Sequence, residues 1–368
     1  MANCPTSPKT RRNGKTSVTP MRQPSWNPIA YAARRPCLAI RQKVIRAIRA
    51  TFEAQDFAEV DTPALQISPG NEVHLHAFKT ILKDPHGGPD QTFYLHTSPE
   101  FAMKKLLVAG EPKLFQIAHT YRNGERSSRH HPEFAMMEWY RAGATTETIK
   151  QDCIDIVRAC ATASGKVLFQ ANGMSCDPFA PWESLSVPDA FTRYAGIDLL
   201  ATAPNPQEPD AALLRKAMAH LNLRTAEDDS WDDLFFRVMG ELIEPFLGKD
   251  RPTFLCDYPI SMAALARPLP ADPRLAERFE LYIAGYEIAN AFGELTDPDE
   301  QLRRFEADMD LKEKLHGERY PIDMDFIAAL RHGMPSASGI AMGIDRLVML
   351  CAGTEKIEDV LWLPVAGG

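Results

Sequence analysis

Two apolar-rich runs near the middle of the chain, Leu114–Tyr121 and Phe134–Tyr140, flank a short polar segment. Runs of this length with a polar connection predict two antiparallel strands joined as a hairpin. Alternate residues of a strand share a face. The residues on one face of the second strand are then Phe134, Met136, Glu138 and Tyr140. This face carries an aromatic ring at one end and a carboxylate beside a phenol at the other.

The connection of this hairpin is rich in basic side chains, namely Arg122, Arg126, Arg129, His130 and His131. Arginine forms paired hydrogen bonds with phosphate and carboxylate groups. Together with the face of the second strand, the arginines could hold a polyphosphate, a stacked base and an amine in one line. For an isolated hairpin, a solvated and charged tip is the alternative.

A second strand pair is predicted in RFELYIAGYEIANAFGELTDP, with its turn near Ala284–Gly285. Alternation places Asn290, Phe292 and Glu294 on one face.

The same strand pair carries further carboxylates, Glu280 and Glu287, without a balancing lysine. Such a surface is costly unless a cation lies there. Oxygen ligands beside a polyphosphate favour Mg²⁺, which typically keeps one or two protein carboxylates. A solvent-facing acidic strand pair is the alternative.

The sequence SGIAMGIDRLVML near the C-terminus predicts an apolar strand followed by a helix. Gly339 and Gly343 within the strand indicate close approach of a ligand or of another backbone. Arg346 falls at the helix N-terminus, where a positive charge is unfavourable to the helix dipole. An anionic ligand explains this placement better than stability does.

Helical periodicity predicts further helices at 38–55, after Ser98, around 149–160, at 211–222 and at 231–247. A short strand, FAEVDTPAL, follows the first of them and should end at Pro63. Ser98 is a good N-cap with Pro99 in the first helical position. Glu100 could serve only the helix dipole or could face a ligand amine. Residues 145–250 contain no candidate catalytic or binding residues, and we interpret them as scaffold or insertion.

Composition narrows the function classes. The 368 residues have a net charge of −8, which gives no broad attraction to nucleic acid. No apolar run reaches the length of a membrane span. The seven cysteines are scattered and form no C-x-x-C pair, which is typical of a cytoplasmic protein without a disulfide framework. Residues 1–35 are basic and polar, and we expect a disordered extension followed by one folded domain over 36–368.

Three segments resemble the signature motifs of class II aminoacyl-tRNA synthetases: EVDTP, YRNGERSSRHHPEF and GIAMGIDR. The sequences TSPEFAMKKL, RHHPEFAMMEWY and ANAFGEL resemble the lysyl branch of that class. The resemblance covers about 41–364 and implies an α+β fold, an antiparallel sheet flanked by helices. It also implies ATP and Mg²⁺ as cofactors and a homodimer formed through the first helix and strand.

Within that class, the chain looks most like the elongation factor P (R)-β-lysine ligases. Lysyl synthetases carry an anticodon-binding OB-fold, for which residues 1–40 are too short, and HGMPSASGIAMGIDR and EWYR are similar to the ligases. Ala341 lies where the ligases carry Ala and lysyl synthetases usually carry Gly. The resemblance implies (R)-β-lysine or lysine as substrate and elongation factor P as acceptor, with tRNA disfavoured. The alternatives are a truncated synthetase that charges tRNA or another acceptor, and a non-catalytic paralogue.

The resemblance also implies a role for individual residues. Arg122 would contact the α-phosphate and the substrate carboxylate, and Arg129, His130 and Arg346 would hold the outer phosphates. Phe134 would stack on adenine, with Gly343 beside the nucleotide, and Glu280 and Glu287 would hold magnesium. The residues implied around the amino acid are Glu100, Glu138, Tyr140, Asn290, Glu294 and Ala341.

The chain departs from the family pattern at one position. Gly124 stands where the family usually carries the glutamate that reads the adenine amino group. Either Glu125 replaces that glutamate through a one-residue shift of the loop, or backbone groups suffice. One lost hydrogen bond to a ligand corresponds to about 1–3 kcal/mol.

Overall fold

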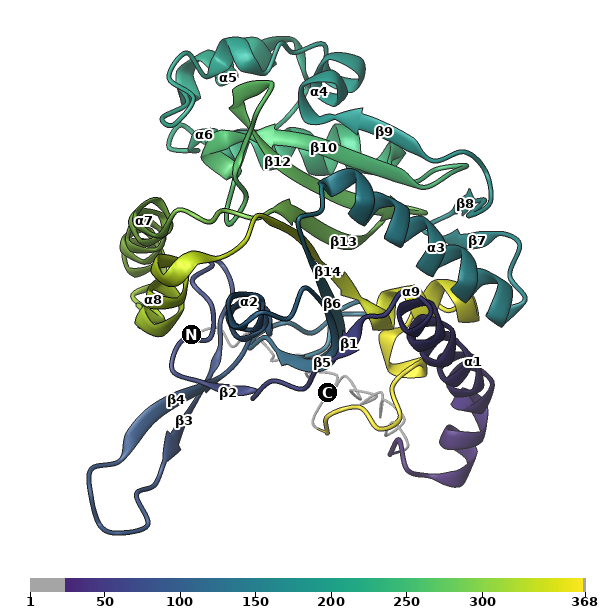
Figure 1. Ribbon diagram of the computed structural model, residues 1–368. Coiled ribbons are helices and arrows are strands. Elements are labelled where there is room, and N and C mark those ends of the chain that lie inside the picture. Colours follow the sequence, from purple (N-terminus) through teal and green to yellow (C-terminus); the bar gives the residue numbers. More distant parts are fainter. Residues whose placement is uncertain (1–23, 367–368) are drawn as a thin grey trace, which may run out of the picture.

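The computed structural model describes residues 24–366, in which one large sheet forms the centre (Figure 1). Its strand order is β1-β5-β6-β14-β13-β12-β10-β9, with β11 paired to β12. The bounds are β1 Ala58–Glu59, β5 Lys113–Tyr121, β6 Glu133–Ala142, β9 Glu183–Ser186, β10 Thr253–Pro259, β11 Pro268–Leu269, β12 Asp272–Ile283, β13 Tyr286–Gly293 and β14 Ala337–Gly343. Pairing is antiparallel except at the two edges, β1 with β5 and β9 with β10. The predicted α+β class with an antiparallel sheet is confirmed.

Helices cover both faces of the sheet, as Figure 1 shows. The helices α1 (Pro28–Glu53), α3 (Thr146–Ser164) and α9 (Ile344–Ala352) share one apolar core with the sheet, whereas α2 (Glu100–Ala109), α7 (Pro298–His316) and α8 (Met324–Gly333) build a second core. A third core lies under α4 (Val187–Ala195), α5 (Ala211–Ala217) and α6 (Trp231–Val238). No helix of the described chain has the length and apolarity needed to cross a bilayer.

The alternation predicted for β6 decides which side chains reach which core. Met137 and Trp139 are fully buried in the core beneath α1, α3 and α9. Their neighbours Met136 and Tyr140 therefore point to the opposite face of the sheet, where Tyr140 joins the second core. The predicted hairpin of β5 and β6 is confirmed, with Tyr121 opposite Glu133.

The N-terminal boundary predicted from composition is wrong within the described residues. Helix α1 begins at Pro28, not near residue 38, so residues 28–35 are helical and do not belong to an extension. Asn27 accepts a hydrogen bond from the Ile29 amide, and Pro28 occupies the first turn, which is a favourable start signal. Arg34 is buried and donates to the Leu361 carbonyl at 2.6 Å. The predicted disorder of residues 1–23 lies outside the described residues.

Other predicted elements hold with changed ends. The strand expected in FAEVDTPAL shrinks to β1. Helix α2 begins at Glu100, with Pro99 and not Ser98 in the N-cap position. The helix expected at 231–247 begins with a capping box of Ser230 and Asp233. Only 231–238 is α-helical, and a π-helical turn followed by a 3-10 turn extends it to Phe246. Two small sheets complete the fold: β2 (Leu65–Gln66) and β3 (Phe78–Leu82) pair with β4 (Gln91–Leu95), and β7 (Phe169–Ala171) pairs with β8 (Met174–Cys176).

One buried ion pair joins the distant ends of the chain. The Asp345 carboxylate, 1% exposed, pairs with the Arg41 guanidinium of α1. Its other oxygen accepts a hydrogen bond from the Ala135 amide at 2.8 Å. Asp345 therefore fixes the start of α9 against α1 and β6.

We expect Asp345→Ala to lower the free energy of unfolding by about 3–5 kcal/mol, because it leaves the Arg41 charge buried without a partner. Glu59→Ala, which breaks the exposed pair with Arg49, should cost less than about 1 kcal/mol. Urea denaturation of both variants measures the difference. Equal losses would show that Asp345 does not anchor α9.

Candidate active site

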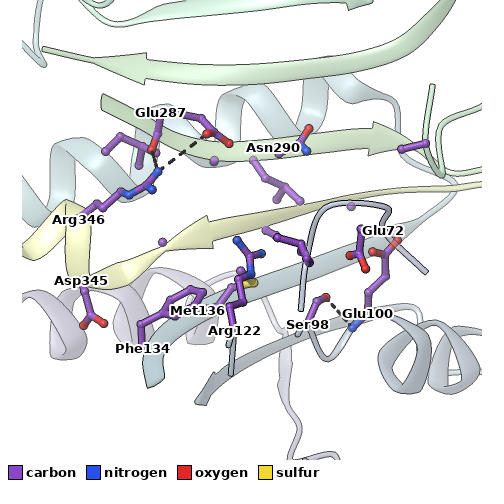
Figure 2. Close-up of a pocket in the computed structure, with 18 of the residues that line it drawn as sticks. Glu72, Ser98, Glu100, Arg122, Phe134, Met136, Glu287, Asn290, Asp345 and Arg346 are labelled. Atoms are coloured by element: carbon purple, nitrogen blue, oxygen red, sulfur yellow. Dashed lines mark hydrogen bonds and ion pairs between the residues drawn. The ribbon is translucent and has the colours of Figure 1, made fainter. Parts of the chain in front are cut away.

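A cavity of ≈ 360 Å³ opens on the face of the sheet that bears Met136 and Tyr140 (Figure 2). The predicted site residues that line it are Glu100, Arg122, Arg129, His130, Phe134, Tyr140, Glu287, Asn290, Glu294, Ala341, Gly343 and Arg346. They come from α2, the β5–β6 connection, β6, the segment Tyr286–Glu294, β14 and the start of α9. Glu138 and Glu280 do not line it: Ser98 and Tyr140 donate to Glu138, and Arg278 and Tyr282 donate to Glu280.

One end of the cavity is basic. Arg346 at the start of α9 donates to the Glu287 carbonyl at 2.8 Å and lies 2.8 Å from His130 Nε2. Burial and the nearby Arg346 charge hold the pKa of His130 below its ordinary value, so this imidazole is neutral at pH 7. Arg129 lies over the Tyr286 ring at 5.6 Å. Both guanidinium groups line the cavity, where they can meet an anion.

Arg122 lies in the middle of the cavity, next to the basic end. Its guanidinium lies 5.2 Å from the centre of the Phe134 ring. A cation stacked on an aromatic face is suited to a planar base on the same ring and an anion on the guanidinium edge. The buried Arg122 Nε has no hydrogen-bond partner among the described residues, which leaves it available to a ligand.

The other end of the cavity is closed and acidic. Its centre is Lys104, fully buried, whose ammonium lies 2.5 Å from Glu100 Oε1 and 2.5 Å from Glu294 Oε2. Burial disfavours the ammonium form, but the two carboxylates outweigh it and hold the pKa of Lys104 above its ordinary value. Glu294 Oε1 is buried and has no hydrogen-bond partner in the described chain.

Glu138 is held by two hydroxyl groups. Ser98 Oγ donates to Glu138 Oε1 at 2.6 Å, and Tyr140 donates to Oε2 at 2.8 Å. Burial raises the pKa of Glu138 to about 8, with added repulsion from Glu100. Burial likewise raises the pKa of Glu294 to about 7, although Lys104 opposes the shift. A ligand ammonium group beside either carboxylate would favour its charged form and offset the cost of desolvation.

The inference from the strand sequence that no basic side chain balances these carboxylates is wrong. Lys104 balances Glu100 and Glu294 from α2, and Arg278 donates to Glu280 Oε1 at 2.7 Å. Tyr282 donates to the other oxygen of Glu280. The sequence offered one signal for Lys104, its spacing of four residues from Glu100, which places both on one side of a helix.

Gly339 is required by side chains and not by a ligand or backbone, as the sequence had suggested. A Cβ at this position would lie 2.6 Å from Glu294 Oε1 and would overlap the Tyr140 ring. At Gly343 a Cβ would meet protein atoms only at 3.9 Å, so the space above it is open to the cavity.

The predicted magnesium ligands fit only a site with few protein ligands. Among the described residues no group of three or more His, Cys, Asp or Glu could hold a metal ion. Glu287, whose side chain is 45% exposed, lines the cavity beside the basic end. Desolvation inside the cavity and repulsion from Glu280 raise the pKa of Glu287, a shift that a cation would reverse. This donor set fits Mg²⁺ that takes most of its ligands from phosphate and water.

The conformation of the loop after Arg122 bears on the departure at Gly124. Gly124 adopts φ +84°, a left-handed conformation that favours glycine. The next side chain, Glu125, lines the cavity and lies 4.0 Å from Arg122. Of the two alternatives, the position of Glu125 favours the shifted glutamate.

Comparison with known proteins agrees with the resemblance to class II aminoacyl-tRNA synthetases. Residues 29–366 match the family described as tRNA synthetases class II (D, K and N). The chain is 38% identical over 343 residues to the elongation factor P–(R)-β-lysine ligase of Yersinia enterocolitica, covering 93% of this chain and 98% of that protein. It is 37% identical over 337 residues to the protein of the same name from Haemophilus ducreyi, covering 92% and 95%.

We expect Lys104→Met to destabilise the protein by about 3–5 kcal/mol at pH 8, because Glu100 and Glu294 lose their counter-ion. The loss should be smaller at pH 5. Without Lys104 the folded-state pKa of Glu294 rises further, and a raised carboxyl pKa lowers stability progressively as the pH climbs from the unfolded value through the folded one. Lys105→Met, one residue along and partly exposed, is the control. Denaturation at both pH values tests this, and a pH-independent loss would contradict it.

Proposed function

This chain belongs to the class II tRNA synthetases (D, K and N), and we propose that it is an ATP-dependent ligase for elongation factor P. It activates (R)-β-lysine, or lysine, as an adenylate and transfers it to a lysine side chain of that protein. The relatives named elongation factor P–(R)-β-lysine ligase support this function over nearly the whole chain. Within the site, one observation carries it: a single cavity has arginines at one end and buried carboxylates at the other.

The first half-reaction needs positioning and charge neutralisation more than acid–base chemistry. A carboxylate oxygen of the amino acid attacks the α-phosphorus of ATP, and pyrophosphate leaves. Arg122 lies between the two ends of the cavity, where it neutralises the carboxylate and the α-phosphate. Arg129 and Arg346 hold the departing phosphates, and Phe134 offers its ring to the adenine. Glu287 would hold Mg²⁺, which would supply positive charge to the phosphates, whereas both oxygens of Glu280 accept hydrogen bonds from Arg278 and Tyr282.

The acidic end selects the amino acid by charge. Glu294 Oε1 and the Tyr140–Glu138 pair face a ligand amine, while Lys104 keeps Glu294 in place. Ala341 lies in β14 between Asn290 of β13 and Glu138 of β6. Its methyl group narrows the floor beneath the amino acid, and we propose that it contributes to the choice between the α- and β-amino forms.

We also propose that the protein works as a cytoplasmic homodimer. The six cysteines in the described part of the chain are free, in agreement with a reducing compartment. Apolar side chains are exposed on the β3–β4 arm, Ile81 at 47% and Leu82 at 44%. Such side chains on a projecting arm support contact with a second copy.

We expect amino-acid-dependent ATP–pyrophosphate exchange to be strongest with (R)-β-lysine, weaker with α-lysine and weakest with ornithine. Glu294→Ala should abolish the amino-acid dependence, because the buried oxygen that awaits the amine is removed. Exchange by Glu294→Ala at the wild-type level would refute the assignment of the amine end. No exchange by the wild-type enzyme with any of the three would refute the activity itself.

Glu125→Ala should weaken ATP binding by about 1–3 kcal/mol, roughly 5- to 150-fold in KM for ATP, if this carboxylate replaces the missing glutamate at Gly124. The KM for the amino acid should stay close to that of the wild type. Arg126→Ala is a control, because this neighbouring residue is exposed and does not line the cavity. An unchanged ATP KM in Glu125→Ala would indicate that backbone groups read the adenine.

A further inference from the structure

Hydrogen bonds at both sides anchor the loop between β2 and β3, which lines the cavity. The buried ammonium of Lys312 in α7 donates to the carbonyl oxygens of Val73 at 3.0 Å and Leu75 at 2.7 Å. At the other side of the loop, Thr97 donates to the Pro69 carbonyl from its amide at 3.0 Å and from its hydroxyl at 2.9 Å. Lys312 is fully buried, and its ammonium group binds backbone carbonyls, which fixes the position of this loop.

These anchors enclose one carboxylate, that of Glu72. Gly70 adopts φ +134°, and a Cβ there would lie 2.8 Å from Thr97 Oγ1 and would overlap Glu72 Oε2. Glycine at position 70 therefore leaves the space in which the Glu72 carboxylate lies. Glu72 lines the cavity together with Ser98 and Glu100, and Figure 2 shows the three at the same end.

The Glu72 carboxylate is available for chemistry. Apart from its own backbone N–H, it has no hydrogen-bond or ion-pair partner in the described chain. The charged groups that face it are Arg122 after β5, Glu100 of α2, and Lys312 and Asp308 of α7. Burial raises its pKa above the ordinary value, with Glu100 adding to the shift while Arg122 and Lys312 oppose it.

We propose that Glu72 is the general base of the transfer half-reaction. This inference rests on the proposed function. The acceptor lysine arrives as an ammonium group and must lose a proton before its nitrogen can attack. Glu72 takes that proton. The new N–C bond forms at the acyl carbon as the C–O bond to the phosphate breaks, and AMP leaves with the electron pair. The second proton of the acceptor nitrogen is lost to the departing phosphate or to water as the amide forms.

The location of Glu72 separates this role from holding the substrate amine. The closed end already matches an amine with Glu294, Glu138 and Tyr140, all buried in the sheet or beside it. Glu72 lies at this end beside Glu100, but its side chain is partly exposed and comes from the loop between β2 and β3. An acceptor side chain from another protein can reach this partly exposed carboxylate, which Arg122 also faces.

The test separates the two half-reactions in Glu72→Gln, which keeps the shape of the side chain. ATP–pyrophosphate exchange with (R)-β-lysine should stay close to the wild type. Single-turnover transfer from the enzyme-bound adenylate to elongation factor P should fall by about 10²–10⁴-fold, the usual contribution of a general base. Hydroxylamine, an amine that is neutral at pH 7, needs no base and should trap the adenylate at the same rate in both enzymes.

Three outcomes would overturn the proposal. Glu72→Gln could transfer to elongation factor P at the wild-type rate, or could lose as much rate with hydroxylamine as with elongation factor P. It could also lose ATP–pyrophosphate exchange along with transfer. The last would make Glu72 a substrate-binding residue. Absence of exchange in the wild type would instead refute the proposed function, before any variant is compared. Glu53→Gln, on the exposed face of α1, is the matched control.

A second variant tests the same point without removing the carboxylate. Gly70→Ala should displace the Glu72 side chain and give the same split between exchange and transfer. The transfer rate of both variants should keep rising with pH, because the fraction of neutral acceptor amine increases until the pH passes the amine pKa of about 10.4. A plateau at the same pH as in the wild type would count against Glu72 as the base.

Discussion

The register of three neighbouring strands, β6, β14 and β13, is the constraint on which the site depends. It places Glu138 opposite Ala341, and Ala341 opposite Asn290, across the floor of the cavity. Because side chains alternate along a strand, a slip by one residue would turn Tyr140 into the core and Trp139 into the cavity. The buried core under α1, α3 and α9 opposes such a slip. The core that stabilises the fold therefore also holds the catalytic face in place.

Charge organises what the register brings together. At the closed end, one buried ammonium, that of Lys104, joins carboxylates from α2 and from the end of β13. Breaking a buried pair is far costlier than its net contribution to stability suggests, so this arrangement favours a defined geometry. A second buried lysine, Lys312, binds backbone carbonyls and fixes the loop that carries Glu72. Helices α2 and α7 thus support the site through charge as well as packing.

Much of the site was predictable because its signals are local. The period of two in 134–140 and 286–294 identified the residues of the cavity floor, and the basic loop identified Arg122, Arg129 and His130. Position-specific resemblance added what periodicity does not carry, such as the significance of Ala341. The departure at Gly124 was also visible in the sequence. Its consequence was not, since it depended on the left-handed turn that brings Glu125 to the cavity.

The sequence by itself determined the strand faces, the main helices and the separation of arginines from carboxylates, because each is written within a few neighbouring residues. Only the tertiary structure decided which charges meet. Lys104 lies 190 positions before Glu294, and Lys312 lies more than 230 after the loop that it anchors. Glu72 had no local signal either, since its importance comes from Gly70, Thr97 and α7 together. Ion pairs and loop anchors of this kind depend on distances between elements, which residue patterns along the chain do not contain.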